Sequence, residues 1–200
     1  STKLKMVECL CRTRRYARAR RELTSLEDSP FLRRNAIVHA EYLALLADVS
    51  TNLGDYRTAR RSGEEAFEIL RNTNENELIA KVQRILGIVL LSEGNLEEAR
   101  VWFEDLLSTY RRTANEEGNM FPLNGLAQLH FYAGRWVQAI QHLERGLEIS
   151  TRLGNEEWSC ANSLSGLSFA AKGWVVPEWM SISFSKKGSM RRLCRSTYES

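Results

Sequence analysis

The segment GDYRTA, residues 54–59, belongs to a motif that returns along the chain at a constant spacing. The segments GNLEEA at 94–99 and GRWVQA at 134–139 follow it at intervals of forty residues. Forty residues before it, RRYARA at 14–19 keeps the aromatic residue and the final alanine but has arginine in place of glycine. A fixed period of this size is the sequence signature of a stacked repeat array.

The residues on both sides of the motif predict a corner between two helices. Apolar or small residues recur at three- and four-residue spacing over 56–70 and again over 78–90, which is the spacing of one helix face. A glycine that ends a helix adopts the left-handed conformation without a steric clash. The Asp or Asn after the glycine is able to cap the next helix. The motif therefore predicts a helix–turn–helix unit.

The same pattern predicts an all-α chain of paired helices. The expected helices span 3–12, 15–27, 33–52, 55–71, 76–92, 95–113, 117–132, 135–152 and 156–172. In pairs they divide a repeat array, residues 1–173, into units of about 1–30, 31–73, 74–114 and 115–153, with a half unit at 154–173. One helical pair cannot bury its apolar face alone, so successive pairs are expected to stack.

The repeated unit resembles the tetratricopeptide repeat. That family has a Leu-Gly or Leu-Ala pair in the first helix, a glycine at the turn, an aromatic residue two positions later and an alanine three beyond that. The matching residues are Leu46-Ala47, Gly54, Tyr56 and Ala59, then Leu86-Gly87, Gly94, Leu96 and Ala99, and then Leu126-Ala127, Gly134, Trp136 and Ala139. The resemblance covers about residues 5–173 and implies a right-handed α-α superhelix of four to five helix pairs.

The forty-residue period exceeds the length of about 34 residues that is usual in this family. It is similar to the long-repeat arrays of bacterial signalling and transcription-regulatory proteins. HEAT and armadillo arrays have a comparable period, but the glycine corner followed by an aromatic residue and an alanine favours the tetratricopeptide repeat. The small alanines are expected to let the two helices of a pair approach closely.

The repeat pattern stops after Gly173. Residues 174–200 replace the expected helix with Pro177, two tryptophans, several serines and a basic run. Three interpretations stay open: an irregular, disordered terminus, a shift of the reading frame near codon 173, and a tail with a specific function. If this tail does not pack, the helix at 156–172 exposes apolar residues, and this end of the array is expected to self-associate.

Composition excludes several classes of protein. The net charge of +3 does not by itself argue for nucleic acid, and no apolar run approaches the roughly 18 residues of a membrane span. The first residues lack the apolar core of a secretory signal. Four cysteines in 200 residues do not make a disulfide framework. We therefore expect reduced thiols and a cytoplasmic location.

The chain carries no motif of an enzyme or a metal site. His39, His130 and His142 share no metal-ligand spacing, and the glycines form no phosphate-binding loop. Cys9 and Cys11 have one residue between them, whereas the cysteines of zinc and redox motifs have two. We expect a non-catalytic protein without a metal or another cofactor.

The resemblance implies a binding groove, because in this family the first helix of each pair lines a concave surface. The corresponding positions are Glu41, Asp48, Lys81, Arg84, Ile88, Phe121, Asn124, Gln128, Phe131 and Tyr132. The set changes from acidic through basic to aromatic and amide, which suits an extended peptide or a partner helix. Phe131 fits the core equally well, and Lys81 and Arg84 can instead pair with Glu77 or Asp48.

These features predict a protein–protein interaction or sensing module, a fragment of a larger signalling or transcription-regulatory protein. Its expected partner is a protein, a peptide or another domain of the parent chain. One alternative is a nucleic-acid-associated module that uses the arginine cluster at 12–21, although acidic residues balance most basic ones and favour a solvated face. Another alternative is an intramolecular scaffold that only spaces other domains.

Overall fold

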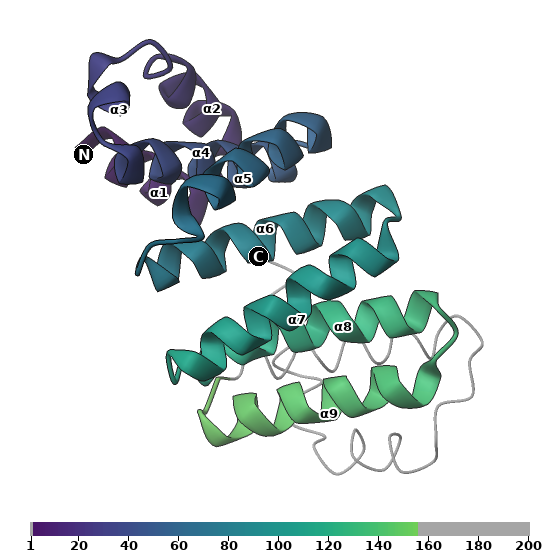
Figure 1. The fold of residues 1–200 in the computed structure, drawn as a ribbon. Coiled ribbons are helices and arrows are strands. Elements are labelled where there is room, and N and C mark those ends of the chain that lie inside the picture. Colours follow the sequence, from purple (N-terminus) through teal and green to yellow (C-terminus); the bar gives the residue numbers. More distant parts are fainter. Residues whose placement is uncertain (1, 156–200) are drawn as a thin grey trace. The chain divides into compact units, whose positions relative to one another are not determined.

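A computed structural model describes residues 2–155 of the chain, apart from the side chain of Arg33. Every regular element among them is a helix, so the expected all-α class of paired helices is confirmed (Figure 1). The chain divides into two compact units, residues 1–115 and 116–200, and each is described by itself. The expected helix at 156–172 and the tail at 174–200 lie outside the described residues.

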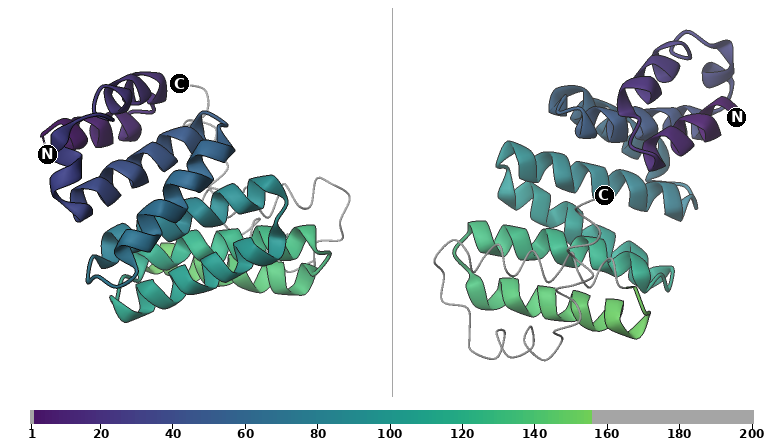
Figure 2. Two further views of the ribbon diagram at one scale, coloured as in Figure 1. Left: turned by 45° about the horizontal axis from the view of Figure 1, so that its top comes forward. Right: turned by 180° about the vertical axis from the view of Figure 1, so that it is seen from behind.

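Unit 1 is a succession of helical hairpins. Its helices are α1 (Thr2–Arg12), α2 (Tyr16–Thr24), α3 (Pro30–Arg34), α4 (Ala36–Asn52), α5 (Tyr56–Leu70), α6 (Asn76–Glu93) and α7 (Leu96–Arg112). The pairs α1/α2, α4/α5 and α6/α7 form the hairpins, with α1 beside α4 and α4 beside α6. Figures 1 and 2 show them following one another in chain order, from purple to teal. One buried apolar cluster extends from Leu4 in α1 to Leu86 in α6, so neighbouring hairpins share a core.

Unit 2 contains one described hairpin. It begins with a 3-10 turn, η1 (Glu117–Asn119), and continues with α8 (Met120–Tyr132) and α9 (Trp136–Arg152), the two green helices of Figure 2. The guanidinium of Arg152 pairs with the carboxylate of Glu116. The Asn155 side chain donates a hydrogen bond of 3.0 Å to Glu117. These contacts hold the end of α9 against the first turn of the unit.

The glycine corners have the conformation that the sequence predicts. Gly54, Gly94 and Gly134 have φ angles of 78°, 82° and 71°, in the left-handed region. Arg14 holds the matching position of the first hairpin and also has a positive φ, of 55°. The repeat geometry therefore imposes this conformation even where the residue is not glycine.

The residues after the glycines differ in their capping role. The Asp55 carboxylate accepts a hydrogen bond of 3.2 Å from the Thr58 amide and caps α5 as expected. Asn95 makes no side-chain cap on α7. Its side-chain amide instead lies 3.5 Å from a carboxylate oxygen of Glu93.

The expected helix at 33–52 is interrupted at Asn35. The backbone of Asn35 is extended, with φ −142° and ψ 113°, and it separates α3 from α4. Its side-chain oxygen accepts hydrogen bonds from the amides of Ile37, at 2.9 Å, and Val38, at 3.2 Å. A good N-cap residue thus starts a new helix inside a stretch whose apolar pattern is continuous.

Small residues allow close contacts between helices. Ala59, Ala99 and Ala139, the alanines of the motif, are all buried. A Cβ atom on Gly63 would lie 2.8 Å from Leu86 Cδ2, and one on Gly87 would lie 2.7 Å from Phe103 Cε1. Both glycines leave room for a large side chain of another helix.

Ala114, which follows α7, has a φ of 51°, and this predicts that Ala114→Gly stabilises the chain. A left-handed residue with a Cβ is strained by about 1–2 kcal/mol, whereas glycine loses about 0.4–1 kcal/mol to its greater freedom when unfolded. The free energy of unfolding is therefore expected to rise by about 1 kcal/mol. Denaturant titration followed by circular dichroism measures it.

Ala133 provides the matched control, because it also follows a helix but has a φ of −83°. Ala133→Gly is expected to lower the free energy of unfolding by about 0.4–1 kcal/mol. Equal destabilisation by both substitutions would show that Ala114 is not strained.

Candidate functional site

Four charged side chains from three helices of unit 1 form the charged cluster: Glu8 on α1, Asp48 on α4, and Lys81 and Arg84 on α6. Lys81 Nζ lies 3.9 Å from Glu8 Oε1, and Arg84 Nη2 lies 3.7 Å from Asp48 Oδ1. Because α1, α4 and α6 are the first helices of successive hairpins, the repeat stacking places residues 8, 48 and 81–84 on neighbouring helices.

The position of the cluster follows from the pattern of burial on α6. Val82, Ile85 and Val89 are buried in the core, whereas Lys81 and Arg84 are half-buried. Lys81 and Arg84 are three residues apart, which puts them on one side of the helix. The core-facing residues of α6 therefore direct both basic side chains toward its less buried face.

Both ion pairs are longer than a direct hydrogen bond between charged groups, which measures about 2.7–2.9 Å. The side chain of Asp48 is only 17% exposed and that of Arg84 25%. Partial burial reduces the screening of these charges by water and salt. The cluster therefore has a stronger local field than charges on a fully solvated helix.

Cys11, on α1, is buried beside the charged cluster, and the charges of the cluster shift the pKa of its thiol. The pKa of the Cys11 thiol is raised to about 11, mainly by burial and then by the negative charges of Asp48 and Glu8, while the positive charge of Lys81 opposes the rise. Tyr110, on α7, is within range of Arg84: burial raises the pKa of the phenol and the positive charge of Arg84 opposes that rise. The reactivity of the Cys11 thiol therefore reports the electrostatic field of the charged cluster.

The predicted groove residues of unit 1 lie on α4 and α6, and Glu41, Asp48, Lys81, Arg84 and Ile88 are all half-buried. The structure brings Asp48 and Arg84 together, one of the pairings that the sequence left open. Lys81 pairs with Glu8 and not with a neighbour on its own helix.

The other five predicted residues lie on α8 of unit 2. The Gln128 side chain donates a hydrogen bond of 2.7 Å to Asn124, Phe121 is exposed, and Tyr132 is 61% exposed. Phe131 is only 8% exposed, and its ring packs edge-on against that of Trp136 at 5.2 Å. This burial agrees with the alternative that the sequence left open for Phe131, a place in the core of the hairpin.

Sequence reasoning missed Glu8, although a signal for it was present. Glu8 precedes Asp48 by forty residues and so occupies the same position of the repeat. The degenerate first unit lacks the corner glycine, which concealed this correspondence. Extending the period to the first helix would have added an acidic residue to the predicted site.

Among residues 2–155, no three His, Cys, Asp or Glu side chains gather so that they could hold a metal ion. His130 and His142 stack between α8 and α9 with ring centroids 5.1 Å apart. No helix described here combines the length and the apolar character that crossing a bilayer requires.

The charges around Cys11 predict opposite effects of two substitutions on its alkylation. Asp48→Asn removes a negative charge, lowers the pKa of the thiol and increases the thiolate fraction at pH 8; Lys81→Met removes a positive charge and decreases that fraction. Because pH 8 is below the thiol pKa of about 11, alkylation by iodoacetamide is expected to become about twofold faster in the first variant and about twofold slower in the second.

Peptide mass mapping measures the rate at Cys11, with the exposed Cys9 as the internal reference. A change in the same direction for both variants would contradict the described arrangement of charges.

Comparison with known proteins relates part of the chain to a family. Residues 39–112 match the tetratricopeptide repeat family, and no curated protein sequence matches the chain. The chain is similar to the crystal structure of aspartyl phosphate phosphatase F from Bacillus subtilis, with 16% identity and a TM-score of 0.66, over 82% of this chain and 44% of that chain. It is also similar to BtubC from P. vanneervenii, with 17% identity and a TM-score of 0.51, over 96% of this chain and 84% of that chain.

The chain thus spans less than half the length of the phosphatase structure. At such identities the likeness concerns the fold, because one fold hosts many functions. The forty-residue period, the glycine corners, the stacked hairpins of unit 1 and the match over 39–112 agree with one another. Residues 39–112 therefore form a region of tetratricopeptide repeats.

Proposed function

We propose that the chain is a non-catalytic interaction module that binds an extended segment of a partner protein across the charged cluster. The observation that carries the proposal is the meeting of two acidic and two basic side chains from three helices, all still partly open to solvent. Charges in such a position favour a complementary partner and reject a like-charged one.

The spacing of the charges favours a segment that carries both signs. Lys81 and Arg84 lie about 4.5 Å apart along the axis of α6, and an acid on a neighbouring helix faces each of them. An acidic side chain of the partner can take the place of Asp48 or Glu8 beside the basic residues. A basic side chain of the partner then pairs with the released acid, so that no partly buried charge is left without a counter-charge.

The wider setting that we propose is a regulatory protein of which this chain forms one part. The similarity to less than half of a longer bacterial protein supports that proposal. The structure named as a phosphatase raises the alternative of an enzyme, which release of phosphate from acetyl phosphate by the purified chain would support. The free thiols of Cys9 and Cys11 are consistent with the cytoplasmic location that we propose.

Reversal of both basic residues of the cluster is the direct test. Lys81→Glu combined with Arg84→Glu puts two negative charges beside Asp48 and Glu8, so the partner's acidic side chain meets repulsion. Peptides selected from a random library on the full chain are expected to lose at least tenfold in affinity for this variant, or about 1.4 kcal/mol. Fluorescence anisotropy measures the dissociation constant, and circular dichroism checks the fold.

Arg57→Glu combined with Arg61→Glu is the matched control. It makes the same change in net charge at two exposed positions of α5. We expect the affinity of this control for the selected peptides to stay within about twofold of the unmodified chain. Equal binding by the unmodified chain and the Lys81/Arg84 variant would refute the charged cluster as the binding site.

The nucleic-acid alternative depends on the arginine cluster of the first hairpin. One member, Arg20, is engaged within the fold: its guanidinium donates a hydrogen bond of 2.6 Å to Ser50 and lies 3.7 Å from Asp55. Binding to phosphates through the remaining arginines would weaken steeply with salt, because it releases counterions. We expect no saturable binding to a random DNA duplex between about 50 and 200 mM salt. Saturable binding with a steep salt dependence would favour this alternative.

A further inference from the structure

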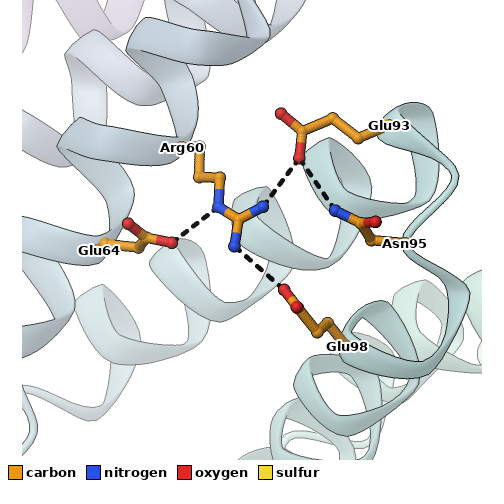
Figure 3. Close-up of polar contacts among 5 residues, drawn as sticks. All are labelled: Arg60, Glu64, Glu93, Asn95 and Glu98. Carbon is orange, nitrogen blue, oxygen red and sulfur yellow. Dashed lines mark hydrogen bonds and ion pairs between the residues drawn. The ribbon is translucent and has the colours of Figure 1, made fainter.

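Arg60, on α5, binds three carboxylates at once (Figure 3). Its Nε donates to Glu64 at 2.8 Å, its Nη1 to Glu93 at 3.1 Å and its Nη2 to Glu98 at 3.1 Å. Glu64 belongs to the same helix, Glu93 is the last residue of α6, and Glu98 lies in the first turn of α7. One guanidinium therefore connects the α4/α5 hairpin to both helices of the next hairpin.

This network differs from an ordinary surface ion pair. Isolated exposed pairs contribute little, whereas the rigid fork of arginine can direct several hydrogen bonds at once. Each of the three nitrogens of Arg60 contacts a different carboxylate, and the Asn95 amide, 3.5 Å from Glu93, adds a further contact (Figure 3). The hydrogen bond to Glu64 is the first of the contacts that raise the pKa of the guanidinium above its usual value.

The position of Arg60 recurs along the chain with the period of the repeat. Arg20, Arg60 and Arg100 each follow the buried alanine of the motif. Arg20 also reaches the next hairpin, through Ser50 and Asp55. Arg100 does not follow this rule, because it binds Glu97 and Glu104 of its own helix at 3.0 Å. Arg100 thus offers the same chemistry without a connection between hairpins.

The Arg60 network lies at the end of the helix that carries the basic half of the charged cluster. Arg84 precedes Glu93 by nine residues, or about 14 Å along the axis of α6. A tilt of α6 by about 10° around its held end would move Arg84 by about 2 Å, given that length. Such a movement is large relative to the 3.7 Å that separates Arg84 from Asp48.

We propose that Arg60 is a positioning residue for the charged cluster: by binding Glu93 and Glu98 it fixes the tilt of α6 relative to the α4/α5 hairpin and so holds Arg84 beside Asp48. The effect on partner binding rests on the function proposed above. The effect on the geometry of the cluster does not: a tilt of α6 also moves Lys81, whose charge acts on Cys11, so Cys11 reports the tilt without any partner.

The test compares Arg60→Met, which keeps the length of the side chain and removes its donors, with Arg100→Met in the full chain. For Arg60→Met we expect a change of at least twofold in the alkylation rate of Cys11 at pH 8. Hydrogen exchange at the amides of residues 90–98 is expected to become at least fivefold faster, and the affinity for the selected peptides at least fivefold weaker. Arg100→Met is expected to leave the alkylation rate and the affinity within error.

Two further variants separate positioning from a general loss of stability. Glu93→Gln combined with Glu98→Gln removes the acceptors and keeps Arg60, and it is expected to reproduce the three changes even if Arg60→Met fails to fold. Arg60→Lys keeps the positive charge. It is expected to recover less than half of the peptide affinity that Arg60→Met loses, because an ammonium is a point charge without the planar fork.

The outcomes distinguish this inference from the proposed function. Equal changes in Arg60→Met and Arg100→Met would overturn the inference, and so would weaker peptide binding without a change at Cys11. If no library peptide binds the full chain while Cys11 and the amides respond to Arg60→Met alone, the proposed function fails and the positioning role of Arg60 stands.

Discussion

Close approach between helices at small residues is the constraint on which the structure of unit 1 depends. Ala47 and Ala59, from the two helices of one hairpin, pack with Ile85 and Val89 of α6, and Gly63 leaves room for the side chain of Leu86. At Gly87 the large side chain is Phe103, from the other helix of the same hairpin. Larger side chains at these positions would separate the helices and leave voids in a core that is otherwise close-packed.

This packing also decides where charge can gather. Because α6 buries one face against α4 and α5, its basic residues occupy the less buried face, beside the acidic residues of α1 and α4. The three corresponding helices come from segments that are about forty residues apart in sequence. The charged cluster is therefore a product of hairpin stacking, and any change in that stacking alters the distances within it.

Binding and packing are coupled in such an array because each hairpin contacts only its neighbours. Arg60 joins one hairpin to the next through Glu93 and Glu98, whereas the carboxylates around Arg100 belong to its own helix. Polar contacts at the corners thus complement the apolar contacts along the helices. In the binding function that we propose, the contacts of Arg60 at the corner set the distances between the charged side chains that a partner meets.

The sequence by itself determined the helical class, the forty-residue period and the left-handed corners at Gly54, Gly94 and Gly134, because these depend on local steric preference and on periodic burial. Only the tertiary structure decided the start of α4 at Asn35, the pairing of Lys81 with Glu8 and the burial of Phe131. The first depends on one side chain that competes with a continuous apolar pattern. The other two depend on contacts between helices, whose side-chain distances are fixed only when the hairpins stack.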